Sequence, residues 1–294
     1  MKKTALTLFF LLFFVSFAFA APQEVRLWPG LAPGETVADE DRAAANNPTH
    51  FTHVTVPTLT VYRPEKRTSS ACLIIFPGGG YGALMGDYEG SEIAKYWNAH
   101  GVTAVVVKYR VPRRPGLEKH QAAWQDGQRA IRWVRAHAAE LQLDPERIGA
   151  TGFSAGGHLT VYLAVNSQTK AYEPVDDLDT VPCHLNFAIP VYPAYVLEDG
   201  KDGANTGKGN DSKLTADLKF EAKTPPMCFI HGDADVYSPM GSIEIYHQLR
   251  RMNIPAEVHI YALKVHGLLN VTPGQGHADT WKDRTWDWFV KMGF

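Results

Sequence analysis

The sequence contains little cysteine and no surplus of basic charge. Its three cysteines are an odd number, which argues against a disulfide framework. Cys72 and Cys228 lie in apolar runs typical of buried strands, and Cys183 has no partner at a zinc-site spacing. The histidines also lack that spacing, so no metal is expected. The 29 basic and 31 acidic side chains give a net charge of −2 without a basic stretch, which argues against a nucleic-acid partner.

The apolar run at the N-terminus is too short for a typical membrane span, which needs about 20 apolar residues. Lys2 and Lys3 precede an apolar run from Leu8 to Val15, and residues 18–20 (Ala-Phe-Ala) form a small-x-small cleavage site. This pattern predicts a secretory signal peptide over residues 1–20, with export to the periplasm or the extracellular space. An uncleaved anchor is the less favoured alternative. No cysteine follows the cleavage site, so no stable membrane anchor is expected.

The chain also lacks internal repeats and a dividing linker, so one domain is expected over residues 21–294. Continuous apolar runs alternate with helix-like patterns along most of it. This alternation predicts an α/β fold, with a mostly parallel, doubly wound sheet and helices on both faces. Strands are expected at residues 25–27, 54–62, 71–76, 102–109, 185–191, 227–230 and 256–261, and helices at residues 90–99, 117–141, 240–252 and 280–292.

Two segments are expected to have little regular structure. The segment between the first two strands contains Asn46, Asn47 and Pro48, which mark a loop. Residues 192–223 carry two clusters of glycine and charged or amide residues, and we predict a loop or a cap insertion there. The acids of this segment do not have the spacing of an EF-hand calcium loop.

The stretch Gly152-Phe153-Ser154-Ala155-Gly156 has the pattern around which the chain is organised. A short apolar run precedes it and a helix-like pattern follows, which is the layout of a nucleophile elbow. The flanking glycines are needed because a Cβ on either one would collide with the opposing element around a strained serine. The free N–H groups of the following helix favour developing negative charge. The pattern predicts Ser154 as a nucleophile.

A serine hydroxyl needs a base to take its proton and usually an acid to orient that base. In a doubly wound sheet, functional groups gather at the C-terminal ends of the strands. Asp233 and Asp235 follow the strand predicted at 227–230, and His266 follows the strand predicted at 256–261. The order Ser, Asp, His along the chain is the one that an α/β hydrolase requires.

Further motifs accompany the elbow along nearly the whole mature chain. They are Phe76–Tyr81 (FPGGGY), Val107–Pro112 (VKYRVP), Asp144–Gly149 (DPERIG), His231–Asp235 (HGDAD) and Val265–Leu268 (VHGL). With these motifs the sequence resembles the α/β-hydrolase superfamily, and in particular secreted bacterial esterases related to acetyl xylan and feruloyl esterases. The resemblance implies an α/β-hydrolase fold, a carbohydrate or small-molecule ester as substrate, and a Ser-His-Asp triad that needs no cofactor.

The resemblance also favours one candidate each for the acid and the base of the triad. Asp235 fits the family's His-Gly-x-x-Asp pattern, whereas Asp233 suits the turn itself. His266 precedes Gly267 as in the family, and His277 is its competitor, better suited to a structural or substrate-contacting role. The remaining histidines near these motifs are expected to be structural; they are His158 and His231.

The oxyanion formed from an ester carbonyl needs hydrogen-bond donors aimed at it. Ala155, which follows the nucleophile, offers one backbone N–H. By analogy with the His-Gly-Gly-Gly loops of related esterases, Gly79 or Gly80 offers the other. Aromatic side chains near strand ends are possible sugar contacts, although each alone is more typical of a core; they include Tyr81, Tyr109 and Tyr192.

Three other functions are compatible with the same motifs. A prolyl-oligopeptidase-type peptidase shares the fold, but the segment before the sheet has no room for a propeller. A lipase is disfavoured because no long apolar lid is visible. A non-catalytic binding protein is disfavoured because every triad member is present.

Overall fold

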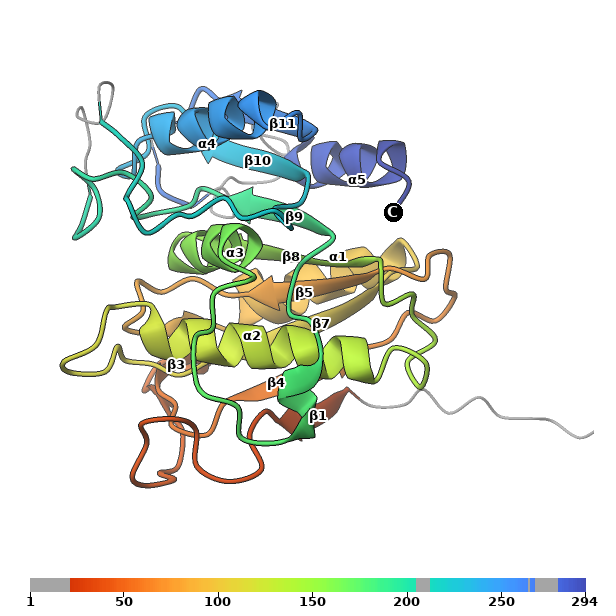
Figure 1. The fold of residues 1–294 in the computed structure, drawn as a ribbon, viewed down its shortest axis with the longest axis vertical. Helices are drawn as coiled ribbons and strands as arrows, with labels where there is room; N and C mark the ends of the chain where they lie inside the picture. The colour runs from red at the N-terminus through yellow and green to blue at the C-terminus, as the bar shows by residue number, and fades with distance from the viewer. Residues whose placement is uncertain (1–21, 205–211, 264, 268–279) are drawn as a thin grey trace, which may run out of the picture.

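The computed structural model describes residues 22–204, 212–263, 265–267 and 280–294. Its main sheet is eight-stranded, in the order β1-β4-β7-β5-β8-β9-β10-β11, and Figure 1 shows it stacked from β1 at the bottom to β11 at the top. The strands are β1 (Gln23–Arg26), β4 (Thr58–Tyr62), β5 (Cys72–Phe76), β7 (Thr103–Lys108), β8 (Ile148–Phe153), β9 (Phe187–Val191), β10 (Met227–Gly232) and β11 (Ala256–Tyr261). The first two pairings are antiparallel and the others from β7 to β11 are parallel, which confirms the predicted mostly parallel sheet.

Helices cover both faces of this sheet, as predicted (Figure 1). They are α1 (Glu92–Ala99), α2 (Gln121–Ala136), α3 (Ala155–Val165), α4 (Met240–Arg251) and α5 (Trp281–Lys291). Side chains of α2, α3 and α4 share one hydrophobic core with Ile74 of β5, whereas α1 and α5 share the other core with Ile75. Successive side chains of a strand point to opposite faces, so a strand covered on both sides is apolar throughout.

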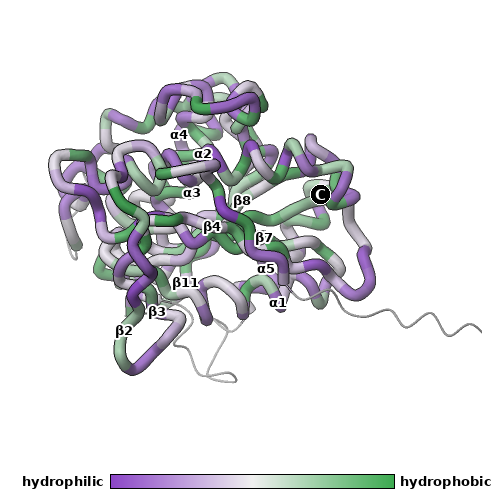
Figure 2. Tube along the Cα trace, turned by 90° about the horizontal axis from the view of Figure 1, so that it is seen from below, coloured by the Kyte–Doolittle hydropathy of each residue, from purple (hydrophilic) through white to green (hydrophobic). Residues whose placement is uncertain are grey.

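Hydropathy along the chain follows this layering. In Figure 2 the central strands, including β7 and β8, are mostly hydrophobic, and hydrophilic segments lie toward the outside. All three cysteines are buried and unbridged, and Cys72 and Cys228 lie in β5 and β10 as expected. Among the helices that the structure describes, none has both the length and the apolar character needed to cross a membrane.

The prediction of a loop around residues 46–48 is wrong for Asn47 and Pro48, which lie in a strand, whereas Asn46 lies in a turn. A second, three-stranded antiparallel sheet is formed there by β2 (Arg42–Ala44), β3 (Asn47–His53) and β6 (Leu84–Met85). The sequence pattern does not indicate β3, because this strand pairs with β6 from a distant part of the chain and the side chains of β3 are at most half-buried. Pro48 is tolerated because it lies at the second position of the strand, near its end.

Two predicted elements are shorter than expected. The helix predicted over residues 117–141 is regular only in α2, because residues 137–141 form turns and Gln142 adopts a left-handed φ of 56°. Ala138 and Leu141 are nevertheless buried, so the apolar pattern correctly indicates buried side chains beyond the end of the helix. The strand predicted over residues 54–62 is regular only in β4, and Val54 forms an isolated bridge with Val111.

The predicted insertion, where the structure describes it, contains no helix or strand. Within residues 192–204 and 212–223, an isolated bridge joins Leu197 to Leu214. The predicted signal peptide, residues 1–20, lies outside the described residues.

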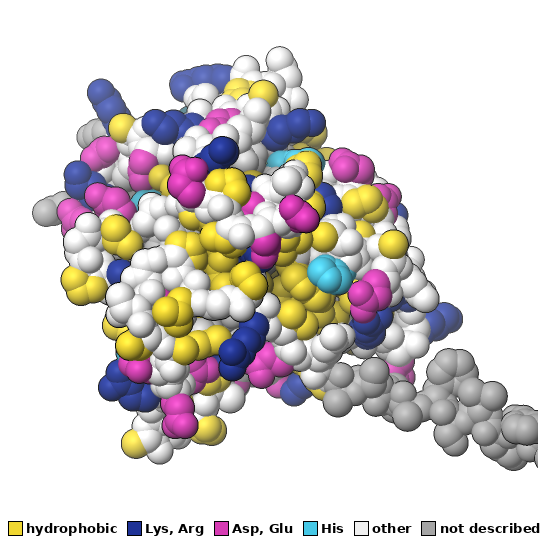
Figure 3. All heavy atoms as spheres, turned by 60° about the horizontal axis from the view of Figure 1, so that its bottom comes forward, with side chains coloured by type: hydrophobic (Ala, Val, Ile, Leu, Met, Phe, Trp, Pro, Cys, Tyr) yellow, Lys and Arg dark blue, Asp and Glu magenta, His cyan; other side chains and the backbone are white. Residues whose placement is uncertain are grey.

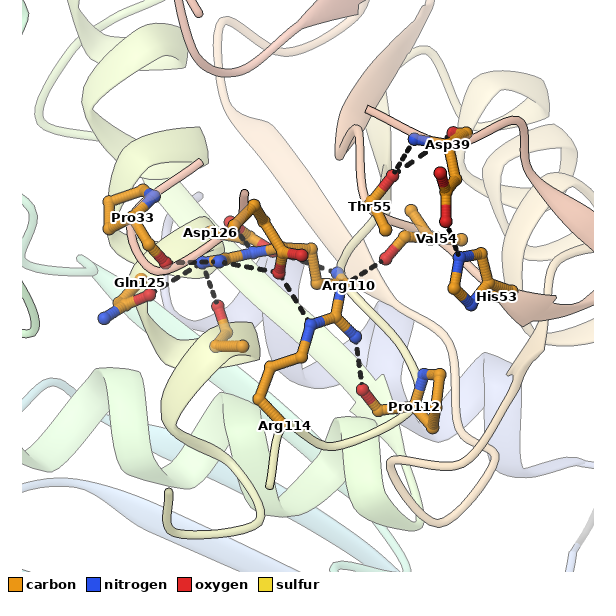
Figure 4. Close-up of polar contacts among 12 residues, drawn as sticks. Pro33, Asp39, His53, Val54, Thr55, Arg110, Pro112, Arg114, Gln125 and Asp126 are labelled. Atoms are coloured by element: carbon orange, nitrogen blue, oxygen red, sulfur yellow. Dashed lines mark hydrogen bonds and ion pairs between the residues drawn. The ribbon is translucent and has the colours of Figure 1, made fainter. Parts of the chain in front are cut away.

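A buried ion network ties the segment before β2 to helix α2 (Figure 4). The Arg110 Nε lies 3.0 Å from Asp126 Oδ2, and neither side chain is exposed. Asp126 Oδ1 also accepts a hydrogen bond of 2.8 Å from Trp28 Nε1. The Arg110 guanidinium donates to Pro33 O and to Glu35 Oε1, at 2.7 and 3.3 Å. Asp126 thus joins two distant segments and compensates the buried charge of Arg110.

Replacing Asp126 with asparagine is expected to lower the free energy of unfolding by about 3–5 kcal/mol, because the buried Arg110 charge loses its main partner. Urea unfolding followed by circular dichroism measures this change. The control is Asp287→Asn in α5, whose ion pair with Arg284 is exposed and contributes little, about 0.5 kcal/mol or less. Equal midpoints for the two variants would contradict the assignment.

Candidate active site

Ser154 lies in a sharp turn between β8 and α3, with a φ of 53° and a ψ of −114°. A Cβ on Gly152 would come within 2.2 Å of Gly156 O, and a Cβ on Gly156 within 2.0 Å of Phe76 O. Only glycine therefore fits at these two positions. The Ser154 N–H donates to Val191 O over 3.1 Å, which fixes the turn against β9. The strained serine conformation is the one that the elbow pattern predicts.

The structure brings together three of the side chains singled out from the sequence. Ser154 Oγ lies 2.7 Å from His266 Nε2, and His266 Nδ1 lies 2.8 Å from Asp235 Oδ1. Asp235 is 3% exposed in the loop after β10, and His266 follows β11. With Nδ1–H donated to the carboxylate, Nε2 is left as an acceptor for the serine hydroxyl. This arrangement is able to activate the hydroxyl as a nucleophile.

The competing residues are placed elsewhere. Asp233 is exposed, and its backbone N–H donates to Tyr261 O over 2.7 Å, which suits the turn. His277 lies outside the described residues. His231 is fully buried between Ser242 Oγ and Tyr237 O, both at 2.9 Å, and burial lowers its pKa to about 4. It is therefore neutral and supports the loop that carries Asp235.

The glycine loop after β5 is held by its carbonyl groups. Pro77 O accepts a hydrogen bond of 2.6 Å from the Tyr109 hydroxyl, and Gly78 O accepts one of 3.1 Å from Met85 N. Gly79 has a φ of 134°, and a Cβ there would lie 2.1 Å from Ala83 O. Only glycine therefore adopts this turn without a clash. The carbonyls point into the protein, where these partners hold them.

One N–H group of this loop donates a hydrogen bond to an internal partner, and the next two belong to residues that line the site. The Gly78 N–H donates to Glu89 Oε2 over 2.7 Å. The N–H groups of Gly79, Gly80 and Ala155 have no acceptor among the residues that the structure describes. Gly79 and Gly80 line the same cavity as Ser154. Unused donors beside a nucleophile are the arrangement that stabilises an oxyanion.

The cavity over Ser154 has a volume of about 270 Å³. Glycine backbone and aromatic rings line most of it, together with the ring of His266. Its lining residues are Gly79, Gly80, Met85, Tyr88, Glu89, Ser154, Tyr192, Tyr237, His266 and Gly267. Tyr237 was not expected from the sequence; its ring centroid lies 5.0 Å from that of His266.

Of the three tyrosines expected as possible substrate contacts, only Tyr192 lines this cavity. Tyr81 and Tyr109 are fully buried, and their hydroxyls are taken up by His158 Nδ1 at 2.7 Å and Pro77 O at 2.6 Å. A substrate role for these two is therefore wrong. They support the glycine loop from the core. His158 is buried, as expected of a structural histidine, and burial holds its pKa well below the usual value.

Glu89 is a site residue that the sequence did not reveal. It lies in the short π-helix η1 (Asp87–Ser91) and is 6% exposed. Its two carboxylate oxygens accept hydrogen bonds from Gly78 N at 2.7 Å and from the Tyr192 hydroxyl at 2.9 Å. Burial raises the pKa of Glu89, and these two hydrogen bonds oppose the rise. No motif marks a single glutamate in a polar segment. Its position depends entirely on the tertiary fold.

Replacing Glu89 with glutamine is expected to lower kcat about ten- to a hundredfold, the loss of one charged hydrogen bond. The Gly78 peptide would be held less firmly, which misplaces the neighbouring N–H donors. Because these donors act mainly in the transition state, KM should change little. The control is Glu92→Gln, an exposed residue of α1 paired with Lys95. An unchanged kcat, or a change in KM alone, would refute a positioning role.

The chain is similar in sequence and in structure to several known hydrolases. The model of the BD-FAE family matches residues 59–199. The crystal structure of an acetyl ester-xyloside bifunctional hydrolase from Caldicellulosiruptor lactoaceticus superimposes with a TM-score of 0.73 and 27% identity, covering 92% of this chain and 97% of that one. The match extends over nearly the whole of both chains.

Two curated relatives are similar over a shorter part of their length. An acetylxylan esterase of Xylanibacter ruminicola is 27% identical over 223 residues, which are 71% of this chain and 43% of the relative. The endo-1,4-beta-xylanase B of Butyrivibrio fibrisolvens is 27% identical over 222 residues, 72% of this chain and 35% of the relative. The chain thus spans less than half the length of these two relatives.

Proposed function

We propose that this chain, an α/β hydrolase related to the BD-FAE family, is a serine esterase that removes acetyl or feruloyl groups from plant-type polysaccharides or oligosaccharides. The observation that carries the proposal is the series Ser154–His266–Asp235, with contacts of 2.7 and 2.8 Å, beside unused backbone N–H groups. The leader predicted at residues 1–20 would export the enzyme to the periplasm or beyond the cell, where such glycans are met.

The reaction is an acyl transfer in two halves. His266 Nε2 takes the hydroxyl proton as Ser154 Oγ forms a bond to the ester carbonyl carbon. The carbonyl oxygen becomes negative and accepts hydrogen bonds from Ala155 N and from Gly79 N or Gly80 N. The bond to the sugar oxygen then breaks, and His266 gives its proton to that oxygen. Asp235 keeps the imidazole oriented and stabilises its charged form.

Water completes the cycle. It gives a proton to His266 Nε2 and attacks the acyl-enzyme carbonyl carbon, again with the negative oxygen at the same N–H donors. The bond from that carbon to Ser154 Oγ breaks, the serine regains its proton from His266, and the carboxylic acid leaves.

The volume of the cavity favours a small acyl group. At about 270 Å³ it lies below the range of roughly 300–1,000 Å³ that is common for sites of drug-sized ligands. An acetyl group fills little space, whereas a feruloyl group needs a slot for an aromatic ring. We therefore expect acetyl esters to be the better substrates. The names of the relatives, which include an acetylxylan esterase and an acetyl ester-xyloside hydrolase, support the same class.

The substrate class is tested by release of acid from acetylated xylan and from methyl ferulate. We expect acetate release to exceed ferulate release. Faster ferulate release would instead identify phenolic esters as the preferred substrates. If neither acid is released, and simple aryl acetates also stay intact, the esterase proposal is rejected.

A further inference from the structure

A second cavity, of about 540 Å³, lies beside the reaction cavity. It is formed by the segment that leads into α2, by two residues of α3, and by the described parts of the insertion at 192–223. Its lining residues are Glu118, Lys119, His120, Gln121, His158, Tyr162, Tyr195, Glu198, Lys201, Asp202, Thr215, Ala216 and Asp217. The insertion, which the proposed reaction does not use, thus supplies about half of the wall.

A pair of tyrosines in contact connects the walls of the two cavities. Tyr195 lines the larger cavity and Tyr237 lines the reaction cavity. Their hydroxyls are 3.3 Å apart and their ring centroids 5.2 Å apart. A Cβ built on Gly80, in the glycine loop, would lie 3.5 Å from the Tyr195 hydroxyl. A glycan held with its ester over Ser154 would therefore meet this second cavity within the next sugar residues.

The cavity contains a buried polar side chain without a hydrogen-bond partner. His120 is 6% exposed, and its ring packs on that of Tyr162 with the centroids 4.2 Å apart. Within the described part of the chain, neither of its ring nitrogens makes a hydrogen bond, and neither is among the polar atoms sealed inside the core, in keeping with the position of His120 in the cavity wall. Burial lowers the pKa of His120, so the ring is neutral. A neutral imidazole offers one donor and one acceptor, which is what a sugar hydroxyl requires.

The charges of this cavity argue against an anionic ligand. Lys119 pairs with Asp202 at 3.4 Å, and Lys201 pairs with Glu198 at 3.5 Å. Both cations are thus neutralised, whereas no ion pair among the described residues involves the carboxylates of Glu118 and Asp217. These carboxylates would repel a phosphate or a uronic acid but accept hydrogen bonds from sugar hydroxyls.

One face of the molecule carries charges of both signs. On the face drawn in Figure 3, basic and acidic side chains are interspersed. Together with the neutral histidine and the free carboxylates, the chemistry of the cavity matches an uncharged, hydroxyl-rich ligand.

We propose that this second cavity is a glycan subsite, which binds a neutral sugar residue of the chain that carries the cleaved ester. The inference rests on the proposed esterase function and deepens it. The subsite would hold the glycan through His120 and Asp217 while the acyl group enters the smaller cavity. The enzyme would then act better on esters of an oligosaccharide than on the same ester of a single sugar.

The test compares kcat/KM for long acetylated xylo-oligosaccharides with kcat/KM for 4-nitrophenyl acetate. His120→Ala is expected to lower the first value about tenfold, through KM, which corresponds to one lost hydrogen bond. The value for 4-nitrophenyl acetate should stay within about twofold. Asp217→Asn is the second variant, in case the buried alanine impairs folding. The matched control is Glu40→Gln, because Glu40 lines a separate cavity together with Glu24 and Thr58.

Equal losses on both substrates, or no loss on either, would overturn the subsite. If the wild type cleaves neither ester, the esterase function fails, and the subsite is judged by binding alone. Deacetylated xylo-oligosaccharides are then titrated calorimetrically into Ser154→Ala. Binding that the added His120→Ala change weakens about tenfold supports the subsite. Absence of binding, or binding unaffected by that change, counts against it.

Discussion

Replacing Ser154 with alanine is expected to lower kcat for 4-nitrophenyl acetate by about 10⁶-fold, as in other enzymes whose Ser-His-Asp nucleophile is removed. The reason is that no other hydroxyl lies at 2.7 Å from His266 Nε2 among the residues that the structure describes. The N–H groups of Ala155, Gly79 and Gly80 remain, so a small residual rate above that of water should persist. Initial rates over a range of enzyme concentrations measure the loss.

The matching control is Ser69→Ala. Ser69 lies before β5, at the end of the sheet opposite the site, where its hydroxyl accepts a hydrogen bond from Ala71 N at 3.0 Å. This variant should keep wild-type kcat. Far-ultraviolet circular dichroism should show that both variants are folded. A Ser154→Ala enzyme that retains a tenth of the activity would place the nucleophile elsewhere.

Replacing Asp235 with asparagine is expected to lower kcat by about 10⁴-fold, the effect of the same change in a serine protease triad. In the wild type, the Asp235 carboxylate accepts a hydrogen bond of 2.8 Å from His266 Nδ1. An asparagine amide can donate to Nδ1 instead, which leaves the proton on Nε2. The imidazole would then be unable to accept the serine proton, although the three side chains would keep their places.

Asp233→Asn is the control for this change, because Asp233 lies two residues away and is exposed. It should retain kcat within about twofold, an effect expected of a surface substitution. If Asp233→Asn and Asp235→Asn lost activity to the same extent, the assignment of the acid to Asp235 would be wrong.

The sequence predicted the sheet well where strands are buried on both faces. β5 and β7 begin and end within a residue of the predicted bounds, because these central strands are covered by helices on both faces and are mostly buried. The strands β2, β3 and β6 escaped prediction because their pairing is long-range and their burial partial. Pattern reading detects burial, and these strands show little of it.

For the site, the elbow and the order of Ser154, Asp235 and His266 were accessible because each follows a recognisable strand. Glu89 and Tyr237 were not, since each enters the cavity from a segment without a motif. Tyr81 and Tyr109 show the reverse error. Their positions near strand ends favour a place in the site, but both side chains point into the core and make their hydrogen bonds there.

The central claim is that Ser154 is the activated nucleophile of an esterase. Its most direct test is to treat the folded protein with a fluorophosphonate and to map the modified peptide by mass spectrometry. We predict one adduct, on Ser154, that is absent from Ser154→Ala and forms far more slowly in Asp235→Asn. Failure of the wild type to react, or an adduct on another residue, would contradict the account.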